Sequence, residues 1–221
     1  MPLQNRVLPT GEIVATSARG TMTGNRGILH GPNKVLSKRR WTHKAWICCE
    51  LEWQGRKREV MNGRNWTELF FLDEAVAFAA GHRPCGYCRR AAFNRFKEAW
   101  ASVHGDWPGV KAVDQVLHQA RLGPTKQEHA KFKAKANALP SGSYFRLNEQ
   151  AFLKLNGDYL PYDPAGYRTA RPVPDKDVDV LTPAPLIEVL RAGYQVFVHP
   201  TGKPSTIAQK MRPKQRQTPR N

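Results

Sequence analysis

The clearest periodic pattern in the chain is helical and begins just after a pair of cysteines. Apolar side chains recur at three- and four-residue spacing over residues 89–104, which predicts an α-helix with one buried face. The residues of that face are Ala92, Phe93, Phe96, Trp100 and Val103. Further helices are predicted over 74–80, 110–121, 126–138 and 184–191. Asp73 and Thr182 are suited to capping two of these helices, and Gly81 to ending one.

Alternating apolar and polar positions predict short strands on both sides of these helices. Residues 44–53 and 57–61 are predicted to pair as a β-hairpin around a Gln54-Gly55 turn. A second hairpin is expected around Asn156-Gly157, because Asn-Gly is typical of two-residue turns. Its strands are 151–155 and 159–162, and the other predicted strands are 67–72, 144–147, 178–181 and 194–199.

The composition is that of a folded protein. The 221 residues are 40% hydrophobic and 10% aromatic, which is enough to bury a core. The longest apolar run, residues 75–80, is far shorter than the ~20 residues that span a bilayer. The N-terminal residues contain no apolar stretch typical of a secretory signal. We therefore expect a cytoplasmic protein that does not enter a membrane.

The chain is strongly basic, and its charge is unevenly distributed. Lys and Arg number 35 against 18 Asp and Glu, a net charge of +17. Residues 1–44 hold eight basic residues and one acidic residue, whereas 149–188 is mildly acidic. Residues 202–221 hold six basic residues, three prolines and no acid, which predicts a disordered basic tail. Clustered positive charge favours a polyanionic partner, so we expect nucleic acid, and DNA rather than RNA.

Four cysteines stand in two close pairs, at 48, 49, 85 and 88. Cys85 and Cys88 form a Cys-x-x-Cys turn at the start of the predicted helix, where Gly86 eases the turn and the helix N-terminus favours thiolates. That spacing lets two sulfur atoms bind one ion. A redox pair would normally follow the first strand of a βαβ unit, but here Gly-His-Arg-Pro precedes the turn. The motif therefore predicts a metal site, with zinc as the cofactor.

Zinc in a closed structural site needs four ligands, so two more must come from elsewhere. The candidates are His30, His43, Cys48, Cys49 and His82. In the predicted strand 44–53, Cys49 shares one face with Ile47 and Leu51, and this face is the more apolar. We therefore expect Cys49 to point into the protein beside the Cys-x-x-Cys turn, and Cys48 to be a free thiol on the other face.

Residues 74–88, with the sequence EAVAFAAGHRPCGYC, resemble the second half of the zinc-binding domain of Ada-type DNA repair proteins. In that family an alanine-rich helix leads through Gly, an aromatic residue, Arg and Pro into a Cys-x-x-Cys pair. The match extends over roughly residues 19–90, and is tightest over 68–90. In the first half of the match, residues 25–30 resemble the entry strand of the family. The cysteine that the family has four residues after this strand is missing from this chain. The resemblance implies a ligand set of His30, Cys49, Cys85 and Cys88.

The whole chain, including residues 181–183 and 190–194, also resembles a group of uncharacterised bacterial proteins. Together, these features predict an α+β fold. A zinc-stabilised, hairpin-plus-helix domain with a helical extension is expected over residues 1–138, followed by a small β-rich unit over 139–200. The basic tail is expected over 201–221.

The leading functional interpretation is a zinc-containing nucleic-acid-binding protein in which the metal is structural. Trp41 stands among three basic residues, an arrangement that can stack on bases and hold phosphate together. The predicted nucleic-acid contacts are Lys38, Arg39, Arg40, Trp41, Arg89 and Arg90. No catalytic residue is assigned.

Two alternatives stay open. The resemblance implies a repair protein whose zinc-bound thiolate, Cys49 or else Cys48, accepts an alkyl group. We expect no such transfer, because the face that carries Cys49 predicts burial. The other alternative is a metal-dependent nuclease that uses Asp114 and His118, which lie four residues apart on one helical face. The same pair could instead be an exposed contact that stabilises the helix.

Overall fold

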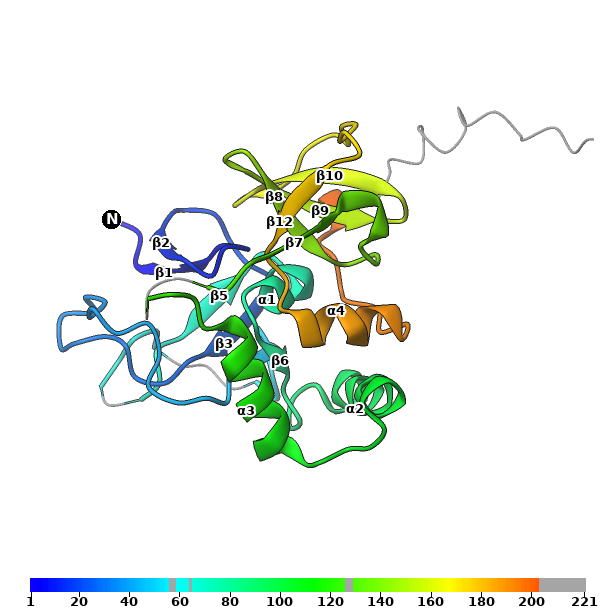
Figure 1. The fold of residues 1–221 in the computed structure, drawn as a ribbon. Helices are drawn as coiled ribbons and strands as arrows, with labels where there is room; N and C mark the ends of the chain where they lie inside the picture. The colour runs from blue at the N-terminus through cyan, green and yellow to red at the C-terminus, as the bar shows by residue number, and fades with distance from the viewer. Residues whose placement is uncertain (56–58, 64, 126–128, 203–221) are drawn as a thin grey trace, which may run out of the picture.

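The computed structural model describes residues 1–55, 59–63, 65–125 and 129–202 and has an α+β fold (Figure 1). A mixed six-stranded sheet and a separate antiparallel six-stranded sheet are accompanied by helices. The predicted fold class is therefore confirmed at this level. Most of the predicted basic tail lies outside the described residues, and the described chain ends in a 3-10 turn, η2 (Pro200–Gly202). None of the described helices combines the length and the apolar character of a membrane-spanning segment.

The mixed sheet has the strand order β2-β1-β5-β3-β4-β6. Its strands are β1 (Gln4–Val7), β2 (Ile13–Ala15), β3 (Met22–Asn25), β4 (Ile47–Glu50), β5 (Leu69–Phe71) and β6 (Arg83–Pro84). The predicted hairpin is wrong in its pairing, since β4 lies between β3 and β6. Residues 57 and 58 lie outside the described part, and residues 59–61 form no strand. The true partner, β3, contains Gly24, whose lack of a side chain allows the backbone of Ile47 to lie close.

The antiparallel sheet has the strand order β11-β10-β9-β8-β12-β7. Its strands are β7 (Phe132–Lys135), β8 (Tyr144–Leu147), β9 (Gln150–Leu155), β10 (Asp158–Asp163), β11 (Gly166–Tyr167) and β12 (Asp177–Val180). The predicted β9–β10 hairpin is confirmed, with positive φ at both Asn156 and Gly157. The predicted helix 126–138 is wrong over its described part, where β7 pairs with β12 and a short 3-10 turn, η1 (Ala136–Ala138), follows.

Pairing across the sheet outweighs helix propensity at β7. Lys133 forms an ion pair with Asp179 at 2.7 Å, and Lys135 lies 3.7 Å from Asp177. Because β7 precedes residue 139, the second sheet draws on chain from both sides of the predicted boundary at 138/139.

The helices are α1 (Glu74–Ala79), α2 (Arg90–His104), α3 (Val110–Arg121) and α4 (Ala184–Arg191). The cap of α1 is confirmed, since Asp73 accepts a hydrogen bond from the Val76 amide at 2.9 Å. Thr182 does not cap α4; its hydroxyl instead accepts from the Tyr144 amide of β8 at 2.9 Å. On α2, Val103 is exposed rather than buried. The predicted strand 194–199 is a loop.

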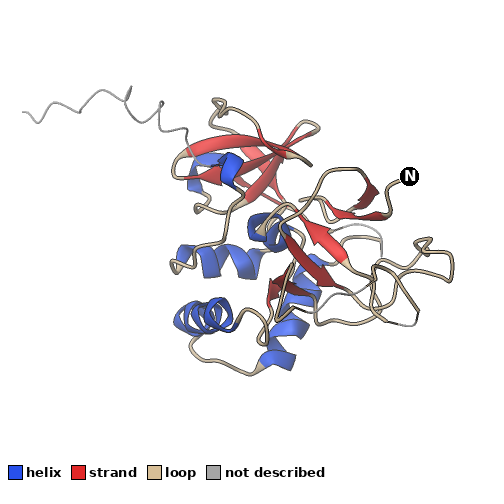
Figure 2. Cartoon of the chain, turned by 180° about the vertical axis from the view of Figure 1, so that it is seen from behind, coloured by secondary structure: helices blue, strands red, loops and turns tan. Residues whose placement is uncertain are grey.

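Helix α1 is entirely buried and packs between the two sheets, as Figure 1 and Figure 2 show from opposite sides. The acid that caps it, Asp73, accepts hydrogen bonds from the Tyr167 hydroxyl at 2.6 Å and the His199 amide at 2.8 Å. Glu74 accepts from the Tyr194 hydroxyl at 2.7 Å and the Phe197 amide at 2.8 Å. These buried acids therefore fasten the C-terminal loop and the second sheet to α1.

A second buried layer surrounds Trp46, just before β4. The guanidinium carbons of Arg26 and Arg121 lie 4.1 Å and 3.8 Å from the Trp46 ring centre, within the range of cation–π contacts. The His82 and His129 rings lie 5.2 Å and 5.5 Å from the same ring. Burial, and then the charges of Arg26 and Arg121, lower the pKa of His82 well below its ordinary value. His82 is therefore a neutral part of the core.

This layer predicts that stability falls in mild acid. The folded state binds a proton at His82 less readily than the unfolded chain does. The stabilisation that neutral His82 gives the folded state is therefore complete above a pH of about 6.5 and is lost as the pH falls. His82→Gln should reduce the loss of unfolding free energy by up to about 1.4 kcal/mol per pH unit below that value. Urea denaturation at several pH values measures this slope.

Asp73 contributes with the opposite sign, because burial raises its pKa to about 6, but it does so equally in both proteins. Parallel pH profiles for the wild type and His82→Gln would contradict the assignment.

Candidate metal centre

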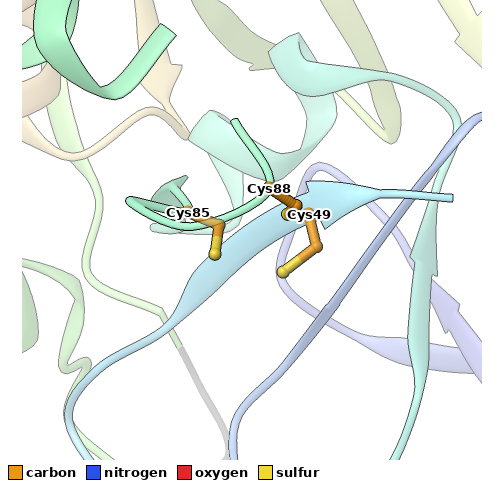
Figure 3. Close-up of side chains that lie close together, drawn as sticks. All are labelled: Cys49, Cys85 and Cys88. Carbon is orange, nitrogen blue, oxygen red and sulfur yellow. The ribbon is translucent and has the colours of Figure 1, made fainter. Parts of the chain in front are cut away.

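Three cysteines from two distant segments of the chain meet at one point. Cys49 belongs to β4, Cys85 follows β6, and Cys88 ends the turn before α2 (Figure 3). Their sulfur atoms all lie within 4.8 Å of one another. Zinc–sulfur bonds of about 2.3 Å at tetrahedral angles place sulfur atoms about 3.8 Å apart. The three cysteines could therefore bind a metal such as zinc.

Strand pairing explains why these cysteines meet. In the parallel pairing of β4 with β6, Ile47 is opposite Arg83 and Cys48 is opposite Pro84, which places Cys85 beside Cys49. The Cys85 amide extends the ladder by donating to the Cys48 carbonyl at 2.9 Å. The chain then turns back through Gly86, so that Cys88 returns to the same sulfur cluster.

Hydrogen bonds favour the thiolate form of Cys85. The Tyr87 amide donates to the Cys85 sulfur at 3.4 Å. Hydrogen bonds from the Cys49 and Cys88 thiols hold the pKa of Cys85 well below its ordinary value. The pKa of Cys49 is raised, because its thiol donates hydrogen bonds to the sulfur atoms of Cys85 and Cys88 and these bonds stabilise the protonated form. Three sulfur atoms thus compete for few protons, an arrangement in which a cation can replace the protons.

Cys49 joins this cluster and Cys48 does not, as predicted, but the predicted orientation of the strand is wrong. Cys48 is completely buried in the core. The face that carries Ile47, Cys49 and Leu51 is the outer one, and Leu51 is 46% exposed. The number of apolar residues on each face did not identify the buried face. Trp46, on the Cys48 face, is larger than the apolar side chains on the opposite face and fills more of the core. Cys49 and Cys88 are consequently only partly buried.

Arg89 does not contact solvent as a nucleic-acid-binding residue would. It is 7% exposed, and its guanidinium pairs with Glu74 at 2.6 Å and Glu50 at 3.1 Å. It also lies 3.8 Å from the Cys48 sulfur. Its charge is already neutralised inside the protein, and its role is to tie the Cys-x-x-Cys turn to β4 and α1.

His30 does not join the three cysteines. Cys49 is opposite Thr23 of β3, whereas His30 follows the other end of β3, beyond Asn25. Its Nδ1 is 2.7 Å from the Thr67 hydroxyl, and its Nε2 is buried with no hydrogen-bond partner among the described residues. No histidine or carboxylate from the described ranges joins the sulfur group. Among the residues outside those ranges, only Glu128 has a side chain of zinc-ligating type. The arrangement therefore supplies three protein ligands.

The other predicted contacts differ in their exposure. Lys38, Arg39 and Arg90 are exposed. Arg40 is partly buried and donates to the Ser37 carbonyl at 2.7 Å. Trp41 is partly buried too, with its ring edge-on to His118 of α3 at 4.5 Å, so its faces are less available to bases than the sequence indicated.

Asp114 and His118 are buried and paired with arginines, not exposed on one helical face. The Asp114 carboxylate forms two hydrogen bonds with Arg83, at 2.7 Å and 2.8 Å. His118 Nδ1 accepts from Arg121 at 3.1 Å. Asp114 therefore joins α3 to β6, whereas His118 packs against Trp41 and Trp46. Neither belongs to a group of potential metal ligands among the described residues.

No protein-family model, curated protein or solved structure matches this chain.

The two neighbouring cysteines of β4 provide a matched test of the metal centre. Cys49→Ala should abolish stoichiometric zinc, because it removes one of three ligands, and it should lower the melting temperature, since the energy of metal binding is energy of folding. Cys48→Ala removes a buried thiol of the same size one residue away and should retain one zinc per chain. Elemental analysis of the purified variants measures the zinc content. Loss of zinc in both variants, or in neither, would contradict the site.

Proposed function

We propose that the chain is a zinc-containing nucleic-acid-binding protein, in which the metal fixes the Cys-x-x-Cys turn to β4 and exposed basic residues contact phosphate. The observation that carries the proposal is the net charge of +17. Such an excess cannot be neutralised within the chain, and it gains free energy by displacing counterions from a polyanion.

The segment 38–40 supports this proposal. Lys38 and Arg39 are exposed, and none of the three basic residues of the segment forms an ion pair with a described carboxylate. Lys133 and Lys135 are different, since each pairs with an aspartate on β12. Segment 38–40 therefore carries positive charge that no described carboxylate neutralises, and it lies in the half of the sequence that also holds the three cysteines.

The metal contributes in a structural way. Three thiolates of β4 and the turn would repel one another without a cation, and zinc would both neutralise them and fix the start of α2. Arg90, exposed in the first turn of α2, would thereby be held in place. DNA is the polyanion that we propose as partner.

Affinity for duplex DNA should fall steeply as salt increases, by about 0.9 in log K per log unit of salt for each phosphate contacted. Replacing Arg39 and Arg40 by Gln should reduce this slope by about 2 if each contacts one phosphate. The control variant, with Lys133 and Lys135 both replaced by Gln, loses the same charge from the other sheet and should keep the wild-type slope. Fluorescence anisotropy across a salt series measures both, and an affinity that does not change with salt would refute nucleic-acid binding.

The exposure of Cys49 and Cys88 favours a second candidate function, alkyl acceptance, which the Ada resemblance implies. The expectation against it rested on the burial of Cys49, and Cys49 is only partly buried. In this reaction a zinc-bound thiolate attacks the methyl carbon of a methylphosphotriester. The S–C bond forms, the C–O bond breaks, and a phosphodiester leaves.

If this candidate is right, incubation with methylphosphotriester DNA should add one methyl group to the protein, located on Cys49, Cys85 or Cys88 by mass spectrometry of peptides. Cys48 should stay unmodified because it is completely buried. An unmodified protein that contains zinc and binds the DNA would exclude alkyl acceptance and leave the binding proposal intact.

A further inference from the structure

A shallow cavity of about 440 Å³, wide open to solvent, lies beside the metal centre. It lies over the outer face of β4, between the Cys-x-x-Cys turn and the adjacent ends of α2 and α3. Its walls are mainly apolar and aromatic, formed by Ala45, Ile47, Tyr87, Phe93 and Val110, with Cys85 at one side. Its volume is within the usual range for small-molecule sites, about 300–1,000 Å³. No motif in the sequence indicated it, because five separate segments contribute to it.

An aromatic side chain stands at the cavity in a defined position. Tyr87 is 58% exposed, and its ring is held edge-on to Trp53 at 6.0 Å. Phe93, on the first turns of α2, is buried on the other side of the turn. Flat aromatic faces beside apolar walls are the features that bind a nucleobase by stacking.

The polar groups of the cavity suit the edge of a base. His43 Nε2 donates to the Asn25 Oδ1 at 3.0 Å, because an amide oxygen can only accept. The amide N–H groups of Asn25 have no acceptor among the described residues and remain for a ligand. Arg83 also lines the cavity, but its charge is neutralised by Asp114.

The surroundings of the cavity are positively charged. Lys44 lies between the lining residues His43 and Ala45, and Lys111 follows Val110; both are exposed. No acidic residue lines the cavity or adjoins a lining residue in the chain. A neutral apolar ligand, or a peptide without acidic residues, would gain no electrostatic attraction from these lysines. A nucleotide offers both a flat ring for the apolar walls and phosphates for the lysines.

We propose that this cavity takes one unpaired nucleobase of a bound nucleic acid, stacked on Tyr87, while Lys44 and Lys111 contact the flanking phosphates. The inference rests on the proposed nucleic-acid binding and specifies its substrate class: strands with an unpaired base in place of a regular duplex. Extruding such a base costs least where it has no partner.

The test compares three DNA duplexes of the same sequence at one salt concentration. One is fully paired, one carries a single bulged adenine, and one carries an abasic residue at the bulge. Wild-type protein should bind the bulged adenine about tenfold more tightly than the abasic bulge, because only the adenine offers a ring that can stack on Tyr87. The abasic bulge and the paired duplex should bind with similar affinity.

Variants of Tyr87 separate stacking from folding. Tyr87→Ala should lose the preference for the bulged adenine, yet keep the backbone amide that donates to Cys85, and therefore its zinc. Tyr87→Phe keeps the ring and should keep the preference. Phe132→Ala removes a partly exposed aromatic ring from β7 of the other sheet and should behave as wild type.

Equal binding of all three duplexes, with normal dependence on salt, would overturn the base pocket and leave nucleic-acid binding standing. A preference for the bulged adenine that persists in zinc-loaded Tyr87→Ala would overturn the pocket as well. Failure to bind any of the duplexes would overturn both proposals.

Discussion

The pairing of β4 with β6 is the constraint on which the metal centre depends. Successive residues of a strand point to opposite faces, so the register decides which of two adjacent cysteines meets the Cys-x-x-Cys turn. With Cys48 opposite Pro84, Cys49 lies beside Cys85, and Cys48 faces the core. A shift of one residue would exchange these positions, bringing Cys48 to the sulfur cluster and turning Cys49 toward the core. The burial of Trp46 on the same face as Cys48 opposes such a shift.

The metal centre is joined to the rest of the fold through buried charge. Arg89, directly after Cys88, pairs with Glu50 of β4 and with Glu74 of α1. Glu74 in turn accepts from Tyr194, in the loop that follows α4. Removing one partner of a buried ion pair leaves the other charge uncompensated, which is strongly destabilising. The cysteine cluster is therefore connected through Arg89 to α1, and through α1 to the second sheet.

Local signals in the sequence were sufficient for several features and insufficient for others. The Asp73 cap and the Asn156-Gly157 turn follow from short-range chemistry, and both agree with the structure. The choice of Cys49 also agrees with the cysteine cluster, but it was reached from the wrong face of the strand, because the pairing of β4 with β6 is long-range. Strands β1 and β3 could not be predicted, because their sequences, QNRV and MTGN, are too polar to show an alternating apolar pattern. The burial of Arg89 was missed because its acidic partners are 39 and 15 residues away.

X-ray absorption at the zinc edge of the purified protein tests the central claim most directly, because it counts the ligand atoms by type. A metal held by Cys49, Cys85 and Cys88 should give three sulfur atoms at about 2.3 Å and one lighter atom completing a tetrahedron. The outer-shell scattering of an imidazole should be absent, since His30 lies apart from the cluster. Four sulfur ligands, a histidine signature, or protein that contains no stoichiometric zinc would contradict the account.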